Sequence, residues 1–426
     1  MWASLNFRIA CACLLLVLSS ASLSQTDSGN DSAALDLKTA MARTLENNPA
    51  LVAFGYQMRA QQGQLQQAGL RPNPELGLLV ENALGSGDLQ GIDSAETTLS
   101  LGWVLERGKR ERRVDAARAG VSLLDAEADI QRLDAAADTA RVFLNTLALQ
   151  ERLRLTGDAV RLAEQTTASV KRRVEAGRTP SADLARAEAE LARIRLDRDN
   201  IEHEMRTSRQ YLAAQWGETR PDFNRVTGNI KQLPVPDSYE QLIARLEQNP
   251  NLSRYVSERR LREAELRLAE AQAKPDWRLT AGVRRLGRSD DQAFVAGITI
   301  PLATRNRNQG RIAEARSRLV MTDADKMATR VQIETQLFAL YEELQHSLHR
   351  AATLSEEILP RIETALADTE RAYAAGRYSY FELKVVQAEL LDARAALVES
   401  SIDAHRRIID IERMTGTPVT SSIALQ

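Results

Sequence analysis

Two stretches of the sequence, AGRTPSADLARAEAEL at residues 176–191 and AGRYSYFELKVVQAEL at residues 375–390, carry one pattern about 200 residues apart. Each starts with Ala-Gly-Arg, ends with Ala-Glu-Leu and follows a long segment rich in alanine and charged residues. Glycine adopts left-handed backbone conformations at little cost, so it commonly ends one helix before a turn into the next. Each stretch therefore predicts the tight turn of a helical hairpin.

The duplication extends over the whole chain at a nearly constant offset. The other matching landmarks are Asn48-Pro49 with Asn249-Pro250, Pro74 with Pro275, and Gly217 with Gly416. We therefore predict two structural repeats, at residues 25–235 and 236–426, which are joined by the proline-rich stretch Leu233-Pro234-Val235-Pro236.

The segments between these landmarks predict very long helices. Residues 107–175 contain no proline and would extend on the order of 100 Å if mostly helical. In the second repeat, apolar residues recur at spacings of three and four, the pattern of a coiled-coil seam. These residues are Leu337, Tyr341, Leu344, Leu348, Ala351 and Leu354, followed past the turn by Leu383, Val386, Leu390 and Leu397. Pro360 is expected to kink the helix between the two sets.

Each repeat also predicts two short strands, at residues 74–84 and 95–106 in the first and at 276–286 and 292–302 in the second. Apolar and polar residues alternate in all four. Their length and their alternation are typical of tilted strands in an outer-membrane barrel, although a half-buried soluble sheet shows the same alternation. Because four strands cannot close and lipid does not tolerate open sheet edges, a membrane barrel would require several chains.

The N-terminal segment predicts export. A basic residue and the apolar run at residues 9–18 indicate a secretory signal peptide, residues 1–24, so the mature chain is expected to begin near Gln25. Both cysteines of the chain, Cys11 and Cys13, lie inside this segment. We therefore expect a mature protein without a thiol and without a lipid-modified cysteine.

Composition excludes several functions. The 56 basic residues do not exceed the 58 acidic ones, which argues against nucleic-acid binding. A mean hydropathy of −0.34 is unlike that of a polytopic helical membrane protein. Phosphate-binding loops and nucleophile–base motifs are absent from the sequence, so we predict neither catalysis nor a cofactor. His346 and His349 are interpreted as surface histidines rather than metal ligands, because the sequence offers them no further histidine nearby and no cysteine in the mature chain.

Several local motifs carry a family resemblance. The first half contains NNP at residues 47–49, LRPNPEL at 70–76 and LERGKR at 105–110. The second half contains IPL at 300–302, RNRNQG at 305–310, and then Tyr373, Gly376, Arg377, Ser379, Tyr380 and Leu383. With these motifs, nearly the whole mature chain resembles the TolC family of outer-membrane efflux proteins, and most closely its CzcC-type heavy-metal branch.

The resemblance implies a mainly α-helical fold with a membrane β-barrel. It implies a TolC-like homotrimer in which four strands per chain form a shared twelve-stranded barrel in outer-membrane lipid, with a long coiled-coil tunnel in the periplasm. It also implies a tripartite pump with a periplasmic adaptor (membrane fusion) protein and an inner-membrane, proton-driven RND-type transporter. Many relatives carry an acylated N-terminal cysteine, whereas this chain is expected to be held in the membrane by the barrel alone.

The resemblance places adaptor docking at the two tips. The residues are Gly177, Arg178, Thr179 and Ser181 in the first tip, and Gly376, Arg377 and Ser379 in the second. The sequence itself predicts a cap at Thr179 with Pro180 at the first helical position, and a Ser-x-x-Glu capping box at Ser379. Both tips would therefore be good turns without any partner, and docking rests on the resemblance.

A carboxylate follows each tip glycine by six residues, Asp183 in the first half and Glu382 in the second. The resemblance implies an acidic ring that narrows the tunnel inside the tip, with Glu382 at the matching position. Three copies of it would attract cations. As the capping-box partner, however, Glu382 needs no channel, and both interpretations stay open. The family's second gate acid is Val385 here, which leaves fewer charges in any ring.

These observations predict a passive exit duct for heavy-metal cations, which leads from the periplasm or cytoplasm to the exterior. One alternative is a TolC-like duct for organic solutes, drugs or polypeptides of type I secretion. Another is a structural coiled-coil protein of the cell envelope. In either kind of duct, the choice of substrate is expected to lie mostly with the inner-membrane transporter.

Overall fold

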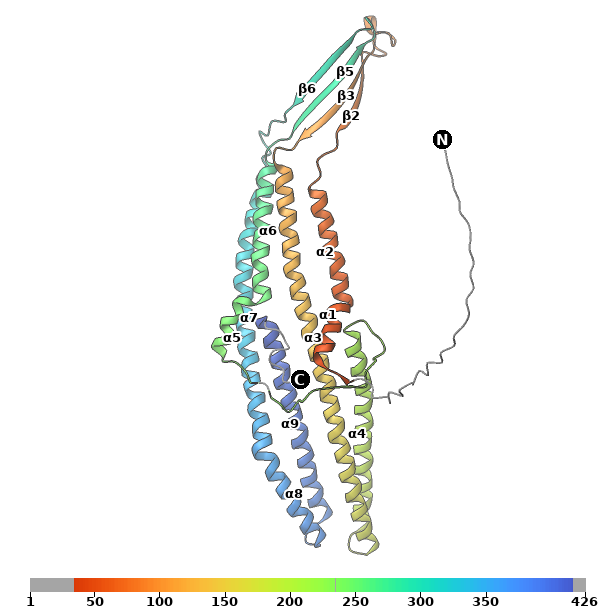
Figure 1. Ribbon diagram of the computed structural model, residues 1–426, viewed down its shortest axis with the longest axis vertical. Helices are drawn as coiled ribbons and strands as arrows, with labels where there is room; N and C mark the ends of the chain where they lie inside the picture. Colours follow the sequence, from red (N-terminus) through yellow and green to blue (C-terminus); the bar gives the residue numbers. More distant parts are fainter. Residues whose placement is uncertain (1–33, 234, 417–426) are drawn as a thin grey trace, which may run out of the picture.

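The computed structural model describes residues 34–233 and 235–416. The predicted signal peptide, both cysteines and Pro234 lie outside these residues. The molecule is elongated, with a β-sheet at one end and two helical tips at the other (Figure 1). Within the described residues, none of the helices is long and apolar enough to cross a membrane.

The two repeats contain corresponding elements. The first comprises β1 (Ala34–Leu35), α1 (Leu37–Asn47), α2 (Pro49–Ala68), β2 (Glu75–Glu81), η1 (Gly87–Leu89), β3 (Glu96–Leu105), α3 (Lys109–Glu175), α4 (Ser181–Ala214) and β4 (Arg225–Val226). The second comprises α5 (Tyr239–Arg245), η2 (Leu246–Gln248), α6 (Pro250–Gln272), β5 (Trp277–Leu286), β6 (Gln292–Thr299), α7 (Gln309–Thr353), the π-helical η3 (Leu354–Ile358), α8 (Leu359–Ala374) and α9 (Tyr380–Thr415).

The four long strands form one antiparallel sheet in the order β2-β3-β5-β6, so β2 and β6 are its open edges. Its apolar face is uncovered: Leu76 is 74% exposed and Phe294 is 76% exposed. Two strands end earlier than the sequence predicted. β2 stops at Glu81 because Asn82 has a φ of 55°. β6 stops at Thr299, shortly before Pro301, which cannot donate a strand hydrogen bond.

The predicted long helices are present. α3 is a single helix of 67 residues, which corresponds to about 100 Å. The seam predicted for the second repeat is buried, and Leu337, Leu344 and Ala351 are each 0% exposed. The break attributed to Pro360 occurs in the turn before it, where the chain forms η3. Proline has no N–H for the helical ladder, and the backbone accommodates this by one wide turn.

The repeated Asn-Pro and Gly landmarks meet in space, a contact that the sequence did not reveal. The side chain of Asn48 caps α2 by accepting from the N–H groups of Ala50 and Leu51, and its Nδ2 donates to the Gln215 carbonyl at 2.8 Å. Asn249 caps α6 in the same way, and its Nδ2 donates to the Met414 carbonyl. Each asparagine thus joins the start of one helix to the end of the hairpin of its own repeat.

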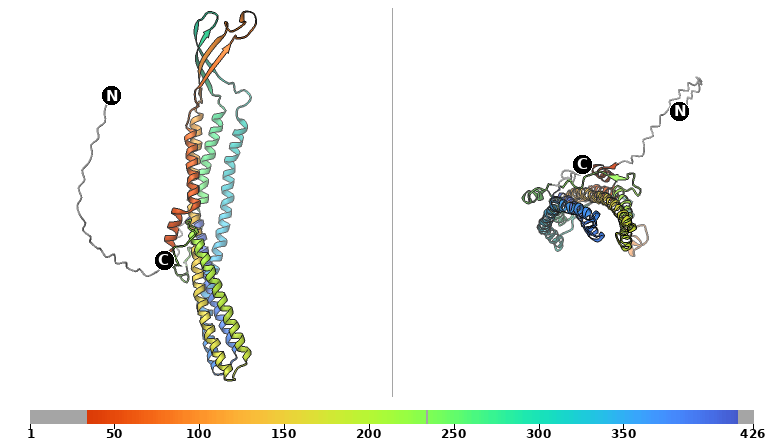
Figure 2. Two further views of the ribbon diagram at one scale, coloured as in Figure 1. Left: turned by 90° about the vertical axis from the view of Figure 1, so that its right-hand side faces the viewer. Right: turned by 90° about the horizontal axis from the view of Figure 1, so that it is seen from below.

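The main hydrophobic core lies at the waist of the molecule, where α1, α3, α7 and α9 meet the segment that links the repeats. Phe143 and Ile409 are fully buried there. β1 pairs with β4 in parallel, and Gln150 of α3 bonds both the N–H and the carbonyl of Val226. Seen from below, the long helices form a curved layer, and α1 and α5 lie on its convex side (Figure 2).

Candidate functional site

The first tip connects α3 to α4 through a glycine turn. Gly177 has a φ of 64°. Its N–H donates to the Val174 carbonyl at 2.9 Å, and the N–H of Arg178 donates to the Arg173 carbonyl at 2.8 Å. These two bonds define a Schellman motif, which satisfies carbonyls at the end of a helix. The turn therefore orients Arg178 and the start of α4 at the end of the molecule.

The second tip repeats this turn and adds a cap. Gly376 has a φ of 74°, its N–H donates to the Tyr373 carbonyl, and the N–H of Arg377 donates to the Ala372 carbonyl. The Ser379 N–H donates to Glu382 Oε2 at 2.6 Å, and the Glu382 N–H donates to Ser379 Oγ at 3.3 Å. The predicted capping box is therefore present at the start of α9.

The predicted cap of the first tip is wrong by one residue. α4 begins at Ser181, and Pro180, rather than Thr179, occupies the N-cap position. Proline offers no side-chain acceptor, so the first turn of α4 has no side-chain cap. Thr179 is half-buried beside it, whereas Arg178 and Ser181 are exposed. The two tips share a backbone turn but differ in how the next helix starts.

The two tip carboxylates have different surroundings. Glu382 is exposed, and the hydrogen bond from the Ser379 N–H lowers its pKa below the ordinary 4.5. Asp183 is half-buried; its nearest cation is Arg186 at 4.0 Å, and its N–H donates to the Pro180 carbonyl at 3.1 Å. Within one chain, then, only Glu382 has a helix-capping duty. Val385, at the position of the family's second gate acid, is 40% exposed.

Just inside the tips, the two hairpins contact each other through a small apolar cluster. Its buried members are Val170, Ala187, Tyr373, Tyr380 and Leu383. Arg173 of α3 lies over the Tyr373 ring, 4.4 Å from its centre, and also donates to the Tyr373 carbonyl. Burial raises the pKa of both the Tyr373 and the Tyr380 hydroxyls, so these tyrosines remain neutral.

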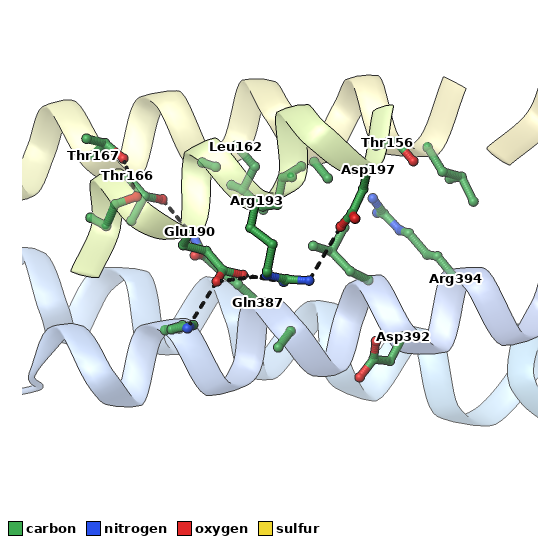
Figure 3. A pocket seen from close by; sticks show the side chains of 18 of the residues that line it. Thr156, Leu162, Thr166, Thr167, Glu190, Arg193, Asp197, Gln387, Asp392 and Arg394 are labelled. Atoms are coloured by element: carbon green, nitrogen blue, oxygen red, sulfur yellow. Dashed lines mark hydrogen bonds and ion pairs between the residues drawn. The ribbon is translucent and has the colours of Figure 1, made fainter. Parts of the chain in front are cut away.

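Farther from the tips, charged side chains line a groove of about 250 Å³ between α3, α4 and α9. Glu190 accepts from Arg193 at 2.6 Å and pairs with Lys384 of α9 at 3.2 Å. The Arg193 hydrogen bond, with a smaller contribution from Lys384, lowers the Glu190 pKa. Figure 3 shows Arg193 between Glu190 and Asp197, and Gln387 reaching Thr166. These contacts connect the two hairpins along their length.

The described residues contain no group of three or more His, Cys, Asp or Glu side chains placed to hold a metal ion. His346 and His349 are both exposed on α7.

Sequence reasoning did not identify Arg173, Glu190 or Lys384. Spacing along the chain shows which residues share a helix face, but it does not show which helices face each other. One signal was available: Arg173 and Tyr373 stand four and three residues before their tip glycines. Residues nearly equally far from two neighbouring tips lie at a similar height, so a contact between Arg173 and Tyr373 could have been tested.

Comparison with known proteins identifies the family. The model of the family described as "Outer membrane efflux protein" matches residues 40–218 and 243–417. The chain belongs to the outer membrane efflux protein family. The match falls in two parts, one in each repeat. The TolC-family resemblance predicted from the tip and strand motifs is therefore confirmed, and the family is one of outer-membrane efflux channels.

Curated relatives carry metal-resistance names. The chain is 27% identical to the cobalt-zinc-cadmium resistance protein CzcC of Cupriavidus metallidurans over 383 residues, a stretch that covers 90% of each of the two chains. It is 26% identical over 289 residues to the nickel and cobalt resistance protein CnrC of the same organism, covering 66% of this chain and 68% of the relative. These matches confirm the predicted likeness to the metal branch.

Solved structures share the fold. The outer membrane protein VceC of Vibrio cholerae matches with a TM-score of 0.70 and 20% identity, covering 90% of this chain and 96% of that one. CusC matches with a TM-score of 0.69 and 18% identity, covering 89% and 92% of the two chains. At these identities the likeness concerns the fold alone. It agrees with the predicted mainly helical, TolC-like architecture.

Proposed function

We propose that this protein is the passive exit duct of a tripartite pump that exports heavy-metal cations across the outer membrane. The observation that carries the proposal is an open-edged sheet with an exposed apolar face, which continues into helices of about 100 Å. The names of the curated relatives favour divalent transition-metal cations as the substrate.

The sheet supports a shared barrel. β2 and β6 have unpaired edges, which lipid does not tolerate. Joining three copies edge to edge gives a homotrimer with twelve strands and no free edge. The apolar face, with Leu78 68% exposed and Ile298 56% exposed, would then contact outer-membrane lipid. A soluble sheet would cover such a face, so this exposure favours the membrane interpretation.

The opposite face of the sheet suits a water-filled channel. It carries Glu75 paired with Arg278, and Arg284 bonded to Glu81, Glu96 and Thr98 at 2.9–3.0 Å. Small residues lie between these charged clusters, so the wall is polar and smooth. Residues 81–96 and 284–292, at the loop end of the sheet, contain six carboxylates and three arginines. This excess of negative charge favours cations at that end of the proposed channel.

The tips are the proposed docking site for a periplasmic adaptor protein. Six of the seven predicted residues are exposed there, and the seventh, Thr179, is half-buried. Arg178 and Arg377 give each tip a cation that an acidic partner surface would recognise. On the strength of the family resemblance, the driving force is assigned to a proton-driven RND-type transporter of the inner membrane. Glu382, with Asp183 nearby, is the proposed acidic gate.

The test is deletion of the gene in its own host, with the adaptor and transporter retained. We expect increased sensitivity to cobalt, zinc, cadmium or nickel, restored by the wild-type gene, and unchanged sensitivity to organic dyes and detergents. The opposite pattern would show a duct for organic solutes. Outer-membrane fractions should contain a heat-resistant trimer. A soluble periplasmic monomer would exclude the duct and leave the structural coiled-coil alternative.

A further inference from the structure

The four segments that join the sheet to the long helices are rich in exposed cations. These segments are residues 69–74, 106–108, 273–276 and 300–308. Their two carboxylates, Glu106 and Asp276, are paired with Arg113 at 2.7 Å and with Lys109 at 2.9 Å, respectively. In the described part of the chain, these pairs leave the basic residues of the segments without a carboxylate partner. We call these exposed residues the basic collar: Arg71, Arg107, Lys274, Arg305 and Arg307.

The opposite end of the sheet carries the opposite charge. The loops at residues 82–95 and 287–291 contain one basic residue, Arg288, and the four carboxylates of Asp88, Asp93, Asp290 and Asp291. These loops lie at the end of the molecule farthest from the helical tips (Figure 1). The sheet therefore separates an acidic end from a cationic end, and the cationic end is the one that adjoins the helices.

The exposed apolar face of the sheet ends near the collar in two tryptophans. Trp103 shares a face with Leu105, because alternate residues of a strand point the same way, and β3 pairs Leu105 with Trp277 of β5. Trp103 is 42% exposed, and Leu302, shortly after β6, is 82% exposed. Tryptophan is enriched where the apolar core of a membrane meets its polar surface. These residues therefore mark a membrane boundary at the level of the collar.

Arg107 shows which side of the sheet the collar reaches. Its guanidinium group lies over the Trp277 ring, 4.8 Å from the ring centre, so this cation lies on the apolar face. Its φ of 46° is left-handed, a conformation that is costly for a residue with a side chain. Strained backbone of this kind is often retained where a side chain has a functional position. The turn holds an unpaired cation against a tryptophan on the face proposed to contact lipid.

The length of the sheet places the collar at the height of lipid headgroups. β5 contains ten residues, which extend about 33 Å. A tilt of about 40° reduces this height to about 25 Å, the height of the apolar band of an outer-membrane barrel. Each end of such a band lies at the headgroups of one leaflet. Because the helices of the proposed duct continue from the collar into the periplasm, the leaflet at the collar is the periplasmic one.

We infer that the basic collar binds the phosphate groups of phospholipids in the periplasmic leaflet of the outer membrane. A guanidinium group can donate two parallel hydrogen bonds to phosphate oxygens. The neighbouring tryptophans can contact the upper part of the acyl chains at the same time. Since the sequence predicts no lipid-modified cysteine, the collar adds a second attachment to the membrane beside the apolar face. The inference rests on the proposed outer-membrane duct and adds a lipid ligand to it.

The test measures lipid binding by trimers of the full mature chain. Trimers purified in mild detergent are titrated with phosphatidylglycerol, with diacylglycerol of the same chains, or with inorganic phosphate, and their dissociation temperature is recorded. We expect only phosphatidylglycerol to raise this temperature. The triple variant Arg71→Gln, Arg107→Gln and Arg305→Gln should need at least about fivefold more phosphatidylglycerol for half of the effect, the factor expected for one lost cation near an anionic lipid.

The matched control removes the same charge elsewhere. Arg260→Gln, Arg350→Gln and Arg361→Gln replace three exposed arginines on α6, α7 and α8 and should leave the phosphatidylglycerol titration unchanged. An equal shift in the control, or no shift in the collar variant, would overturn the inference. An equal response to diacylglycerol would show that acyl chains alone bind. An equal response to inorganic phosphate would make the collar a site for free phosphate. Either response would overturn the lipid ligand.

Tryptophan fluorescence distinguishes failure of this inference from failure of the proposed function. Trp2 lies in the predicted signal peptide, so a Trp216→Phe variant of the mature chain keeps only Trp103 and Trp277. Phospholipids brominated near the headgroup should quench this fluorescence in reconstituted vesicles. Quenching without a phosphatidylglycerol effect on the trimer would overturn the collar and leave the duct standing. Absence of quenching would place the sheet outside the membrane and overturn both.

Discussion

The first hairpin runs without interruption from the waist to its tip. The outer helix of the second hairpin is broken at η3, which directly precedes α8 and ends two residues before Pro360. Both tips use the same Schellman turn, yet only the second adds a capping box. The turn is therefore the feature that the two repeats share, because both hairpins reverse direction at the same end of the molecule. The helix starts beyond the turn are where the halves have diverged.

The largest expected difference concerns the tip glycines. Gly376→Val and Gly177→Val both place a β-branched residue at positive φ, which should cost about 2 kcal/mol. A side-chain carbon at Gly376 would also lie 3.4 Å from Arg173, while one at Gly177 meets nothing within 4 Å. Gly376→Val should therefore lower the melting temperature and metal resistance more, with trimers retained.

Asparagine is the control at both glycines, since it tolerates left-handed backbone better than other residues. The melting temperatures and metal resistance of Gly376→Asn and Gly177→Asn should lie between those of the corresponding valine variant and those of the wild type. Metal resistance that stays unchanged in both valine variants would count against adaptor docking at the tips.

Several features of the two repeats could be predicted from the sequence. The glycine turns, the alternating strands and the buried seam of α7 follow from local patterns that physical chemistry makes specific. The contacts between elements were not accessible. Asn48 and Gln215, or Arg173 and Tyr373, are far apart in the chain and meet only because the helices pack in one particular order. The cap at Thr179 failed because proline was assigned to the first helical position, which Ser181 occupies.

Arg173 links the two hairpins, and its replacement should have the next largest effect on stability. Arg173→Ala loses the contact with the Tyr373 ring and the hydrogen bond to its carbonyl, an expected loss of about 1–2 kcal/mol. The Tyr373 carbonyl keeps its bond from Gly376, so the protein should still fold. Spin labels on the two tips should report a broader distance distribution. Arg172→Ala, at the neighbouring exposed position, should change neither quantity; equal effects of both variants would show that charge alone matters.

At the waist the halves differ in a titratable group. His405 of α9 is fully buried, and its Nε2 donates to the Ile230 carbonyl at 3.1 Å; the corresponding residue of the first half, Arg206, is exposed. Burial lowers the His405 pKa below the ordinary 6.5. The unfolded chain therefore binds the proton first, and stability falls as the pH drops below 6.5, by at most about 1.4 kcal/mol per pH unit.

Melting temperatures between pH 7.5 and pH 5 check this expectation. His405→Gln retains a donor for Ile230 and carries no titratable proton, so its profile should be flatter than that of the wild type. Arg206→Gln should leave the profile unchanged. Parallel profiles for His405→Gln and the wild type would assign the acid sensitivity to other groups.

The smallest expected effect on stability, and the sharpest on function, belongs to Glu382. Glutamine can still accept from the Ser379 N–H but carries no charge. Glu382→Gln should therefore leave the melting temperature near neutral pH unchanged. If the carboxylate lines the channel, single-channel recordings of the purified trimer should show reduced cation preference and a lost response to acid. Asp183→Asn is the control, because it removes a tip charge that caps no helix.

The pH of the acid response distinguishes the two roles of Glu382. The cap holds its pKa below 4.5 in a single chain, so its capping contribution is present above that pH and is lost only as the pH falls through the lower value. Three carboxylates gathered on a common axis would repel one another and raise their pKa values. A response with its midpoint above 4.5 therefore indicates an acidic ring in the trimer. If Glu382→Gln leaves conductance, selectivity and acid response as they were, Glu382 serves only to start α9, and the second tip differs from the first in stability rather than in gating.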